Sequence, residues 1–447
     1  MIGWFARRAA VVAFPNLFRN TSSMLPMHRL FFILALTASP LSAADWPEWR
    51  GGPARDGVWD EPGLPKSLPK DGPKILWKQT IGTGYSGPSV AGDRLYVLDR
   101  LKPPLAAQDM ERVLCFSAID GRPLWTNAYP CALKLKGGYE NGPRSTPTVR
   151  DGKVYSLGAM GNLFCLDSRD GKIIWSHDLR KEFQAHLPDW GLANAPLIEG
   201  RLVIIQAGGQ ANATVMAFDR ESGKEVWRSL SDEAGYASIT AIESGRTRQL
   251  IVWTGDALAS LDPATGRVFW REPRVLAWKQ AVMTPIFHAE KNLLLIASDR
   301  ETVHTLQLGK DAPGFKVLWD VPSLNSLHSN PVLDGDHVYG VNHDGKIKEE
   351  CGEFRCISIA TGEKMWAVTN VTRIGGFAHA SVTRNAGNGV WYVLNEYGEL
   401  ILAEATPKEY RELARGQLTG KTWSHPAFAN RRIYARAENS LVCASLE

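Results

Sequence analysis

Short apolar stretches recur along the chain, and eight of them share one place in a repeating pattern. Each is usually opened by Pro and is followed within a few residues by a second apolar strand, such as Leu95–Leu98 or Val154–Tyr155. Proline is tolerated at the start of a strand because its missing N–H costs no ladder hydrogen bond there. The pattern therefore predicts eight short inner strands at Gly87–Val90, Thr146–Val149, Ala195–Ile198, Ile239–Ile242, Thr284–Phe287, Asn330–Leu333, His379–Val382 and His425–Phe428.

A second repeating feature is a turn phrase that ends in tryptophan. The best copies, Cys165–Trp175, Ala217–Trp227 and Ser260–Trp270, carry Asp at the third position, Gly at the seventh and Trp at the eleventh. This arrangement is typical of a strand, a tight turn that uses Asp and Gly, and a second strand. Ser117 and Ser358 replace the Asp in two weaker copies. The unit that ends at Trp319 has lost the phrase and keeps only its alternating strands.

Seven tryptophans mark the repeat, at intervals of 48, 50, 52, 43, 49 and 47 residues. A fixed period of this size is typical of a repeat architecture. Because an indole ring buries a large apolar face, we expect each of them to cover the joint between neighbouring units. These structural docking residues are Trp77, Trp125, Trp175, Trp227, Trp270, Trp319 and Trp366.

The content of each unit indicates the fold class. One period supplies four short antiparallel strands, which make one propeller blade. The last unit ends one strand short, whereas the strand Ile75–Thr80 has no unit before it. Pairing the two would complete an eighth blade and remove the exposed edges of an open array. The sequence therefore predicts an all-β, eight-bladed β-propeller over residues 75–447, closed by an N-terminal strand, with an inserted loop around Leu101–Glu111.

The first 44 residues differ in character from the rest of the chain. From Met27, a charged start, an apolar run at Leu30–Leu36 and the small residues Ser42–Ala44 follow one another, which is the pattern of a secretory signal. We therefore predict a removable signal peptide over 1–44, with Met27 as an alternative start and an N-terminal membrane anchor as the alternative role. Residues 45–74 would form an extension that packs on the propeller.

Charge and composition narrow the function classes. Of 447 residues, 44% are hydrophobic and 22% are charged, as in folded globular proteins. The formal net charge of +4 comes entirely from the first 44 residues, which leaves 47 basic and 47 acidic residues from Asp45 onward. This balance argues against a nucleic-acid partner. Because no later apolar run is long enough to span a bilayer, we expect a periplasmic or extracellular monomer with no membrane span after signal cleavage.

Six cysteines in an exported chain raise the question of disulfides. Cys115, Cys165 and Cys356 each lie ten residues before a repeating Trp, and Cys443 takes the same slot in the last unit. We expect these four to be small buried hydrophobes. Only Cys351 and Cys356 are close enough for a local bridge, which stays open as an alternative. No second Cys or His pair accompanies them, so no metal site is assigned.

The complete phrase Ala217–Trp227 resembles the tryptophan-docking repeat of pyrroloquinoline-quinone (PQQ) propellers. The resemblance covers about residues 75–447 and implies the propeller fold. One branch of that superfamily, the quinoprotein alcohol dehydrogenases, holds PQQ and a calcium ion on the axis. The other branch is non-catalytic and includes BamB-like scaffolds of outer-membrane assembly. The opening Asp45–Gly52, followed by Asp56-Gly57, is similar to the start of many exported proteins with PQQ-like repeats.

The dehydrogenase branch makes demands that this sequence meets poorly. Its members cover the quinone with a disulfide between adjacent cysteines, and no two cysteines are adjacent here. No acidic and Asn cluster for calcium is evident at the inner-strand starts. We therefore expect no cofactor and no catalytic residue, and favour a non-catalytic binding or scaffold protein with a protein partner in the cell envelope. The alternative is a PQQ- and calcium-dependent alcohol or sugar dehydrogenase.

Residues at and just before the start of each inner strand should point towards the axial funnel, because the inner strands stand side by side around the axis. Three histidines would lie on one side of this funnel. They could bind a metal or an anionic ligand, or hydrogen-bond loop carbonyls, which is the favoured interpretation. The candidate ligand-binding residues are Tyr85, Arg144, Asn194, Lys279, His328, Asn330, His379, Trp423 and His425, with Ser86, Ser145, Ser329, Phe377 and Ser424 in the same slots.

Three stretches interrupt the repeat and are expected to be loops between strands. They are Lys134–Tyr139, Gln184–Gly191 and Lys346–Gly352. Loops carry binding residues disproportionately because a rigid scaffold positions them. These loops are therefore the expected partner contacts, with Trp190 as an example.

Overall fold

The computed structural model describes residues 45–132, 135, 142–209, 212–274, 276–298, 303–343, 348–374 and 378–447. The predicted signal peptide over 1–44, Phe377, the predicted loop Lys134–Tyr139 except Leu135, and residues 346–347 of the predicted loop Lys346–Gly352 fall outside these ranges. Within them, every helix is too short or too polar to cross a membrane.

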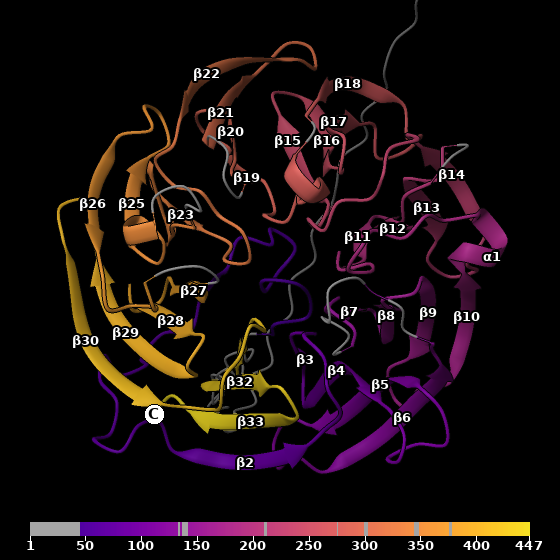
Figure 1. Cartoon of the computed structure of the whole chain (residues 1–447), viewed down its shortest axis with the longest axis horizontal. Coiled ribbons are helices and arrows are strands. Elements are labelled where there is room, and N and C mark those ends of the chain that lie inside the picture. The colour runs from indigo at the N-terminus through magenta and orange to yellow at the C-terminus, as the bar shows by residue number, and fades with distance from the viewer. Residues whose placement is uncertain are drawn as a thin grey trace, which may run out of the picture. The chain divides into compact units, whose positions relative to one another are not determined.

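Eight antiparallel sheets surround a central axis as the blades of a propeller, which confirms the predicted fold class (Figure 1). In each blade the first strand lies nearest the axis and the last lies at the rim. Blades 1 to 4 consist of β3 (Ser89–Ala91), β4 (Arg94–Leu101), β5 (Met110–Ser117) and β6 (Pro123–Pro130); β7 (Thr148–Arg150), β8 (Lys153–Leu157), β9 (Asn162–Asp167) and β10 (Ile173–Asp178); β11 (Leu197–Glu199), β12 (Leu202–Gln206), β13 (Val215–Asp219) and β14 (Glu225–Ser229); and β15 (Thr240–Ser244), β16 (Thr247–Trp253), β17 (Ala257–Leu261) and β18 (Val268–Pro273).

Blades 5 to 8 continue the same order around the ring. They consist of β19 (Ile286–His288), β20 (Leu293–Ile296), β21 (Val303–Leu308) and β22 (Phe315–Val321); β23 (Val332–Asp334), β24 (His337–Val341), β25 (Phe354–Ser358) and β26 (Lys364–Val368); β27 (Ala380–Asn385), β28 (Trp391–Asn395), β29 (Glu399–Ala405) and β30 (Tyr410–Gln417); and β31 (Ala427–Ala429), β32 (Arg432–Ala437) and β33 (Ser440–Ser445) with β2 (Ile75–Thr80). The helical turns in the described ranges are α1 (Leu179–Phe183), η2 (Ala277–Lys279) and η3 (Lys348–Glu350).

The ring closes where the two ends of the propeller pair. β2 lies antiparallel to β33 and completes blade 8, which confirms the predicted pairing of Ile75–Thr80 with the last unit. Across the joint with blade 1, the buried guanidinium of Arg436 donates to the carbonyl oxygens of Leu98 at 2.5 Å and Gly82 at 2.9 Å. Burial lowers the pKa of Arg436 to about 10, so it stays charged at neutral pH. The closure therefore combines a β ladder with a buried cation bonded to backbone carbonyls.

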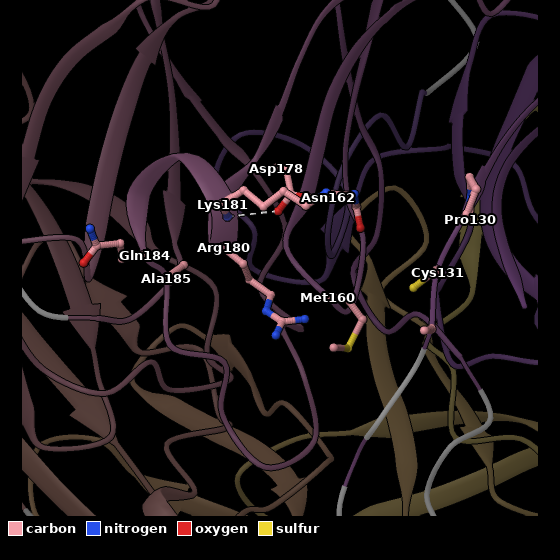
Figure 2. Close-up of a pocket in the computed structure, with 10 residues that line it drawn as sticks. Pro130, Cys131, Met160, Asn162, Asp178, Arg180, Lys181, Gln184 and Ala185 are labelled. Carbon is pink, nitrogen blue, oxygen red and sulfur yellow. Dashed lines mark hydrogen bonds and ion pairs between the residues drawn. The ribbon is translucent and has the colours of Figure 1, made fainter.

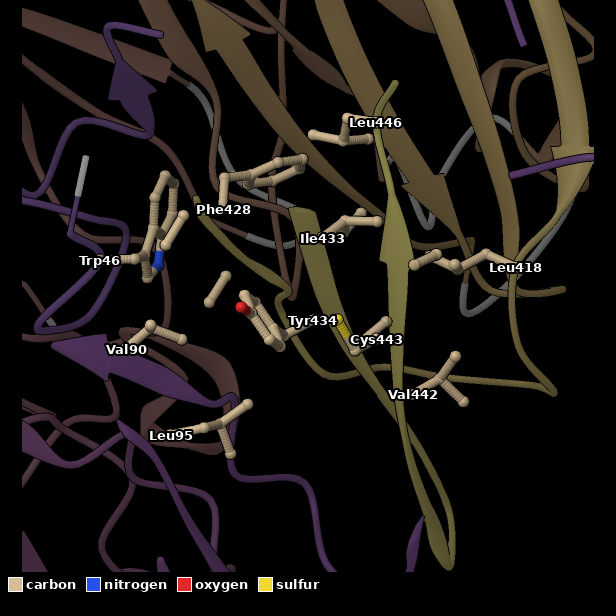
Figure 3. Close-up of a cluster of buried hydrophobic side chains, with 14 of the residues drawn as sticks. Trp46, Val90, Leu95, Leu418, Phe428, Ile433, Tyr434, Val442, Cys443 and Leu446 are labelled. Carbon is tan, nitrogen blue, oxygen red and sulfur yellow. The ribbon is translucent and has the colours of Figure 1, made fainter. Parts of the chain in front are cut away.

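Apolar side chains from three parts of the chain fill the same joint (Figure 3). Leu95 comes from blade 1, Phe428 and Tyr434 come from blade 8, and Trp46 comes from the N-terminal extension. All four are at most 2% exposed. Burial of large apolar side chains is the main favourable term in folding, so this cluster holds the two ends of the ring together.

Each repeating tryptophan except Trp270 reaches the turn of the next blade. The indole Nε1–H of Trp125 donates to the carbonyl of Ser168 at 3.0 Å, and its ring lies over Gly171 of the same turn. Gly171 has φ 72°, and a Cβ there would come within 2.5 Å of the ring. The glycine of the phrase is therefore required twice, for the left-handed backbone and for the docked ring. The bonds run Trp77 to Ala118, Trp125 to Ser168, Trp175 to Arg220, Trp227 to Pro263, Trp319 to Ile359 and Trp366 to Thr406.

Trp270 faces the altered turn of blade 5, which has lost the phrase. Its Nε1 has no hydrogen-bond partner in the described part of the chain, and its ring packs against Phe315 of blade 5 at 4.8 Å between centroids. The altered turn of blade 5 thus offers Trp270 no carbonyl of the kind that the six other tryptophans bind, whereas the turn of blade 7, which also lacks the phrase, keeps its acceptor at Thr406.

The cysteine slot lies between a tyrosine and the tryptophan of the same blade. Cys165, for example, is paired in register with Tyr155 on one side and with Trp175 on the other. All six cysteines are buried and none forms a disulfide, so the alternative bridge between Cys351 and Cys356 is wrong. Burial raises the pKa of the thiols, to about 12 at Cys165 and about 11 at Cys356, which keeps them protonated.

The predicted insertion in blade 1 is shorter than expected. β4 continues to Leu101 and β5 begins at Met110, so Glu111 belongs to a strand and pairs with Arg100. The connecting loop is 102–109. The polar residues that interrupt the apolar pattern, such as Arg100 and Glu111, belong to β4 and β5, which are longer than the corresponding strands of most other blades.

The N-terminal extension passes through the centre of the ring, where it contacts all eight blades (Figure 1, indigo). The backbone of Trp46 pairs with Val90 of blade 1 at 2.9 and 2.7 Å. Further along, β1 (Val58–Trp59) adds to β27 of blade 7 as a parallel fifth strand. Contacts with the remaining blades run from Pro47 to Val149, from Arg55 to Pro196 and Ile239, from Trp49 to Thr284, from Arg50 to Pro331 and from Glu61 to Arg431.

Two buried arginines fasten the extension. Arg55 donates through Nε to Glu48 at 2.8 Å, and its terminal nitrogens reach carbonyl oxygens of blades 3 and 4 at 2.6 to 3.3 Å. Arg50 donates to the carbonyls of Pro331 and Asp56, both at 2.7 Å. A buried guanidinium needs such partners because an unpaired charge is expensive to desolvate. The extension is therefore part of the folded ring and fills its axis.

Candidate functional site

Six of the nine predicted funnel residues are joined by direct contacts at one end of the axis. They lie on the connections that run from the rim of one blade to the inner strand of the next. Each connection ends just before a short inner strand, so its last residues lie near the axis, here in blades 1, 2, 6, 7 and 8. These six residues, called the axial mouth below, are Tyr85, Arg144, His328, His379, Trp423 and His425.

Aromatic rings form one side of the axial mouth. The ring of Trp423 lies nearly parallel to those of Tyr85 and His328, at 6.1 and 5.8 Å between centroids. The guanidinium of Arg144 lies 5.0 Å from the centroid of Tyr85. Burial lowers the pKa of Arg144, and the tyrosines Tyr85 and Tyr236 oppose that shift. The arrangement is a stack of rings capped by a cation, which cation–π attraction stabilises.

Histidines form the other side of the axial mouth. The rings of His379 and His425 meet edge to face at 5.8 Å. Nε2 of His425 lies 3.4 Å from the carbonyl oxygen of His328, and Nδ1 of His379 lies 3.5 Å from the hydroxyl of Ser329. Nε2 of His379 is buried with no hydrogen-bond partner in the described ranges. The contact of His425 with the carbonyl of His328 agrees with the favoured interpretation, in which the histidines hydrogen-bond loop carbonyls.

Both buried imidazoles are neutral. Burial, with Arg50 next, lowers the pKa of His425 to about 3. Burial lowers the pKa of His379 well below its usual value, and His425, His328 and His343 add to the effect. A neutral imidazole could ligate a metal, but the described residues contain no group of three His, Cys, Asp or Glu side chains placed to hold one. Among the described residues, the metal-binding alternative for these histidines therefore has no three-ligand group to support it.

The two predicted asparagines do not face a ligand. The side chain of Asn194 is fully buried and bonds the backbone of Gln206 through both its nitrogen (2.7 Å) and its oxygen (3.0 Å). Oδ1 of Asn330 accepts the N–H of Thr284 at 2.8 Å. Both amides thus bind backbone groups, Asn194 at the end of β12 and Asn330 on the connection that leads into β19. Their assignment to the ligand site is not supported by these positions.

Lys279 lies on η2, on the connection between blades 4 and 5, and pairs with Asp256. The bond to Asp256 raises the pKa of Lys279. Its charge is therefore satisfied within blade 4. Within the described part of the chain, no ring contact or hydrogen bond joins Lys279 to the axial mouth.

The described residues do not fit a calcium-bound quinone. Calcium takes six to eight oxygen ligands, mostly carboxylates. Near His379, Glu396 accepts the N–H of Arg373 at 3.0 Å, but burial raises the pKa of Glu396 and so favours its neutral form. The amides of Asn194 and Asn330 bind backbone groups. The axial mouth supplies one cation, Arg144, and several aromatic rings. Among the described residues it offers no cluster of oxygen atoms that could bind calcium.

The N-terminal extension forms the floor of the axial mouth. The ring of Trp49 meets His425 edge to face at 4.5 Å, and its Nε1 donates to the hydroxyl of Thr284 at 3.2 Å. Trp49, Arg50 and His343 are site residues that the repeat pattern does not predict. The sequence feature that could have identified Trp49 and Arg50 is the concentration of Trp, Arg and Gly between Trp46 and Gly57, before the first strand.

A separate cavity of about 570 Å³ lies towards the rim, between blade 1 and α1 of blade 2 (Figure 2). Arg180 and Met160 are directed into the same space, while Lys181 pairs with Asp178 at 2.8 Å. None of the predicted funnel residues contributes to it. Its lining residues are Pro130, Cys131, Ala132, Met160, Asn162, Asp178, Arg180, Lys181, Gln184 and Ala185.

The predicted partner loops that the structure describes lie beside these features. Gln184 of the loop Gln184–Gly191 borders the rim cavity. Trp190 packs against Tyr236 at 5.7 Å and is half-buried, so little of its ring is free for a partner. In the third loop, Glu350 pairs with Arg355, which holds η3 against blade 6.

Comparisons with known proteins agree with this architecture. Quinoprotein alcohol dehydrogenase PedH of Pseudomonas putida is 26% identical over 163 residues, which cover 34% of this chain and 26% of PedH. The solved structure of BamB from Moraxella catarrhalis has a TM-score of 0.56 at 15% identity and covers 83% of this chain and 98% of that one. Quinohemoprotein alcohol dehydrogenase from Comamonas testosteroni has a TM-score of 0.64 at 14% identity, covering 90% and 80%. At such identities the two structures show a shared fold only.

The family match is more extensive. A family model described as outer membrane protein assembly factor BamB matches residues 109–368, from the third strand of blade 1 to the last strand of blade 6. This range holds the tryptophan-docking turns of blades 1 to 6, with the one irregular turn in blade 5. With its eight closed blades and PQQ-like repeats, the chain belongs to the family described as outer membrane protein assembly factor BamB.

Proposed function

We propose that this protein is a non-catalytic binding or scaffold propeller of the cell envelope, exported to the periplasm or beyond and acting as a monomer on a protein partner. One observation carries the proposal: the axis of the ring is filled by the chain's own extension. Arg50 and Arg55 lie there almost fully buried and are bonded to inner-strand carbonyls of blades 3, 4 and 6. A ring whose axis is filled by its own chain offers its loop faces to a partner.

The chemistry of the axial mouth supports a binding role. His379 and His425 are neutral, and neither has a carboxylate partner among the described residues that would tune it as a general base. The thiols are buried and protonated. The axial mouth is built from the connections between blades, and such loops carry binding residues. The family match favours the same role.

The alternative is a PQQ- and calcium-dependent alcohol or sugar dehydrogenase. A quinoprotein alcohol dehydrogenase among the sequence relatives favours it, together with the cation Arg144 beside stacked rings, which would suit an anionic planar cofactor. The lack of a described calcium ligand set weighs against it.

A cofactor-binding melt separates the two roles. The purified chain would be heated alone, with PQQ, with calcium, and with both, and then assayed for dye-linked oxidation of primary alcohols. The binding role predicts the same melting temperature in all four samples and no dye reduction. A rise that needs both PQQ and calcium, together with alcohol oxidation, would establish the dehydrogenase instead.

The partner is tested by cross-linking in the intact envelope. A photoreactive residue would replace Ile374, an exposed side chain on the connection between blades 6 and 7, and for comparison Val226, an exposed side chain on the rim strand β14. The proposal predicts a discrete adduct with another protein from position 374 and none from position 226. Recovery of the chain only as an unattached monomer from both positions would count against it.

A further inference from the structure

The rim cavity between blade 1 and α1 lies apart from the axial mouth, and the proposed function assigns it no role. Its volume of about 570 Å³ is that of a site for a small molecule. Apolar and sulfur-bearing side chains such as Pro130, Cys131 and Met160 line it together with polar ones. What such a cavity can bind depends on which of its polar groups are still free.

Arg180 brings an unpaired cation to this cavity. Its side chain is exposed and forms no hydrogen bond or ion pair with a described residue. The stem lies against the turn between β8 and β9, because a Cβ placed on Gly161 would be 3.6 Å from Cγ of Arg180. Beyond this contact the guanidinium is directed into the same space as the side chain of Met160 (Figure 2). The stem thus packs on blade 2 while the charged end stays in the cavity.

The other two charged side chains of the described lining neutralise each other. Nζ of Lys181 lies 2.8 Å from the carboxylate of Asp178. That carboxylate also accepts the backbone N–H of Lys181 at 3.2 Å, as the N-cap of α1. Because Arg180 and Lys181 are positive and Asp178 is negative, the described lining carries one net positive charge. A single charge suits a monovalent anion, whereas a phosphate dianion would be left partly uncompensated and repelled by Asp178.

Asn162 adds a neutral polar group to the same wall. It pairs in register with Asp178 across β9 and β10, which places both side chains on one face of blade 2. Both line the cavity. The side-chain amide of Asn162 forms no hydrogen bond with a described residue, so its N–H groups are available to an acceptor.

We propose that the rim cavity binds a small monocarboxylate that carries a short apolar chain. The planar guanidinium of Arg180 matches the two oxygens of a carboxylate with two parallel N–H donors. The amide of Asn162 is a further donor in the same lining. The chain of the acid would lie against the apolar part of the wall, where burial of its methylene groups favours binding. This inference goes beyond the proposed function, because it adds a small-molecule ligand to a protein that binds a partner.

The site is tested with probes that share one chain and differ in charge. The full chain would be isotopically labelled at its methionine methyl groups, and the resonance of Met160 identified by its loss in Met160→Leu. Hexanoate would be titrated, with hexanol, hexylamine and hexyl phosphate as the matched probes and acetate as the acid without a chain. We expect a saturable shift of the Met160 resonance with hexanoate, and a shift at least several-fold smaller with each other probe at the same concentration.

Variants of the cation show whether Arg180 is responsible. Arg180→Gln should reduce the response to hexanoate at least several-fold, and Arg180→Lys should reduce it less, because an ammonium group keeps the charge without the fork. Arg246→Gln is the matched control. Arg246 is also exposed, lies in the turn between β15 and β16, and forms no ion pair with a described residue. Its replacement should leave the response unchanged.

Three results would overturn the inference. The Met160 resonance could stay fixed with hexanoate, move as far with hexanol, hexylamine or hexyl phosphate, or keep its full response in Arg180→Gln. A response to acetate equal to that of hexanoate would also contradict it, because the apolar wall would then contribute nothing. The proposed partner is tested separately at position 374, so the two proposals fail independently.

Discussion

Glu48 and Arg55 form an ion pair inside the propeller axis, with 2.8 Å between Oε2 and Nε and side chains that are 2% and 0% exposed. Seven residues apart in sequence, they meet because the extension turns back on itself within the ring. The terminal nitrogens of Arg55 continue to the backbone of blades 3 and 4. The pair thus connects the extension to the ring from inside.

Breaking this pair should be strongly destabilising. Arg55→Met leaves the carboxylate of Glu48 buried, which typically costs about 3–5 kcal/mol of unfolding free energy. Arg150→Met is the matched control, because Arg150 also bonds Glu48, at 2.9 Å, but its side chain is 32% exposed. Urea unfolding should show a markedly larger loss for Arg55→Met. Equal, small losses would mean that the extension contributes little to the stability of the ring.

The docked rings predict a specific sensitivity at the turn glycines. Gly171→Ala should cost about 1–2 kcal/mol for the left-handed backbone and about 1–3 kcal/mol more for displacing the ring of Trp125. Gly200→Ala carries the backbone cost alone, because its φ is 56° and no atom lies within 4 Å of the added Cβ. Denaturant midpoints of the two variants give the difference. If Gly171→Ala is no worse than Gly200→Ala, the ring does not rest on this glycine.

The missing acceptor of Trp270 should be measurable. Trp227→Phe removes the hydrogen bond to the carbonyl of Pro263 at 3.0 Å, whereas Trp270→Phe removes none within the described structure. The first variant should therefore lose about 1 kcal/mol more unfolding free energy than the second. Chemical denaturation of both purified variants provides the comparison. A larger loss at Trp270 would contradict this account of the altered turn in blade 5.

The buried imidazole of His425 should make stability depend on pH. Its pKa falls to about 3 in the fold, against an ordinary value of 6.5. Between these values the unfolded chain binds a proton that the folded chain does not, so stability is lost as the pH falls below about 6.5. His425→Gln removes this pH-dependent contribution to the free energy of unfolding. The advantage of the wild type over the variant should shrink by about 1.4 kcal/mol per pH unit below that point, as unfolding curves at several pH values would show. Parallel profiles would indicate that His425 titrates normally.

The repeat could be predicted because its causes are local. The phrase that ends at Trp175 needs Asp and Gly for one tight turn, and the ring and the glycine it contacts recur one period apart. The same local logic identified the closing strand Ile75–Thr80. It also placed the inserted loop of blade 1 around Leu101–Glu111, where the structure has a loop at 102–109. The bounds differ by a few residues because strand pairing, which the apolar pattern does not show, extends β4 and β5.

The candidate site was predicted only in part, for a related reason. A slot at the start of an inner strand places a residue near the axis, and Tyr85, Trp423 and His425 do meet there. The slot does not specify where the side chain turns. Asn194 bonds the backbone because a buried amide must satisfy its polar atoms, and Lys279 turns to Asp256 because a counter-charge is nearer than the mouth.

The sequence by itself determined the eight-bladed ring, its closure and the docking tryptophans, since each depends on contacts between residues one repeat apart or on simple completion of a missing strand. Only the tertiary structure decided what occupies the axis. The contact of Arg55 with Pro196 and that of Trp49 with Thr284 join residues more than 100 positions apart, outside any period of the chain. The folded ring brings carbonyls near the inner strands and a hydroxyl from several blades to the axis, and the buried arginines and an indole bind there because buried polar groups need hydrogen-bond partners.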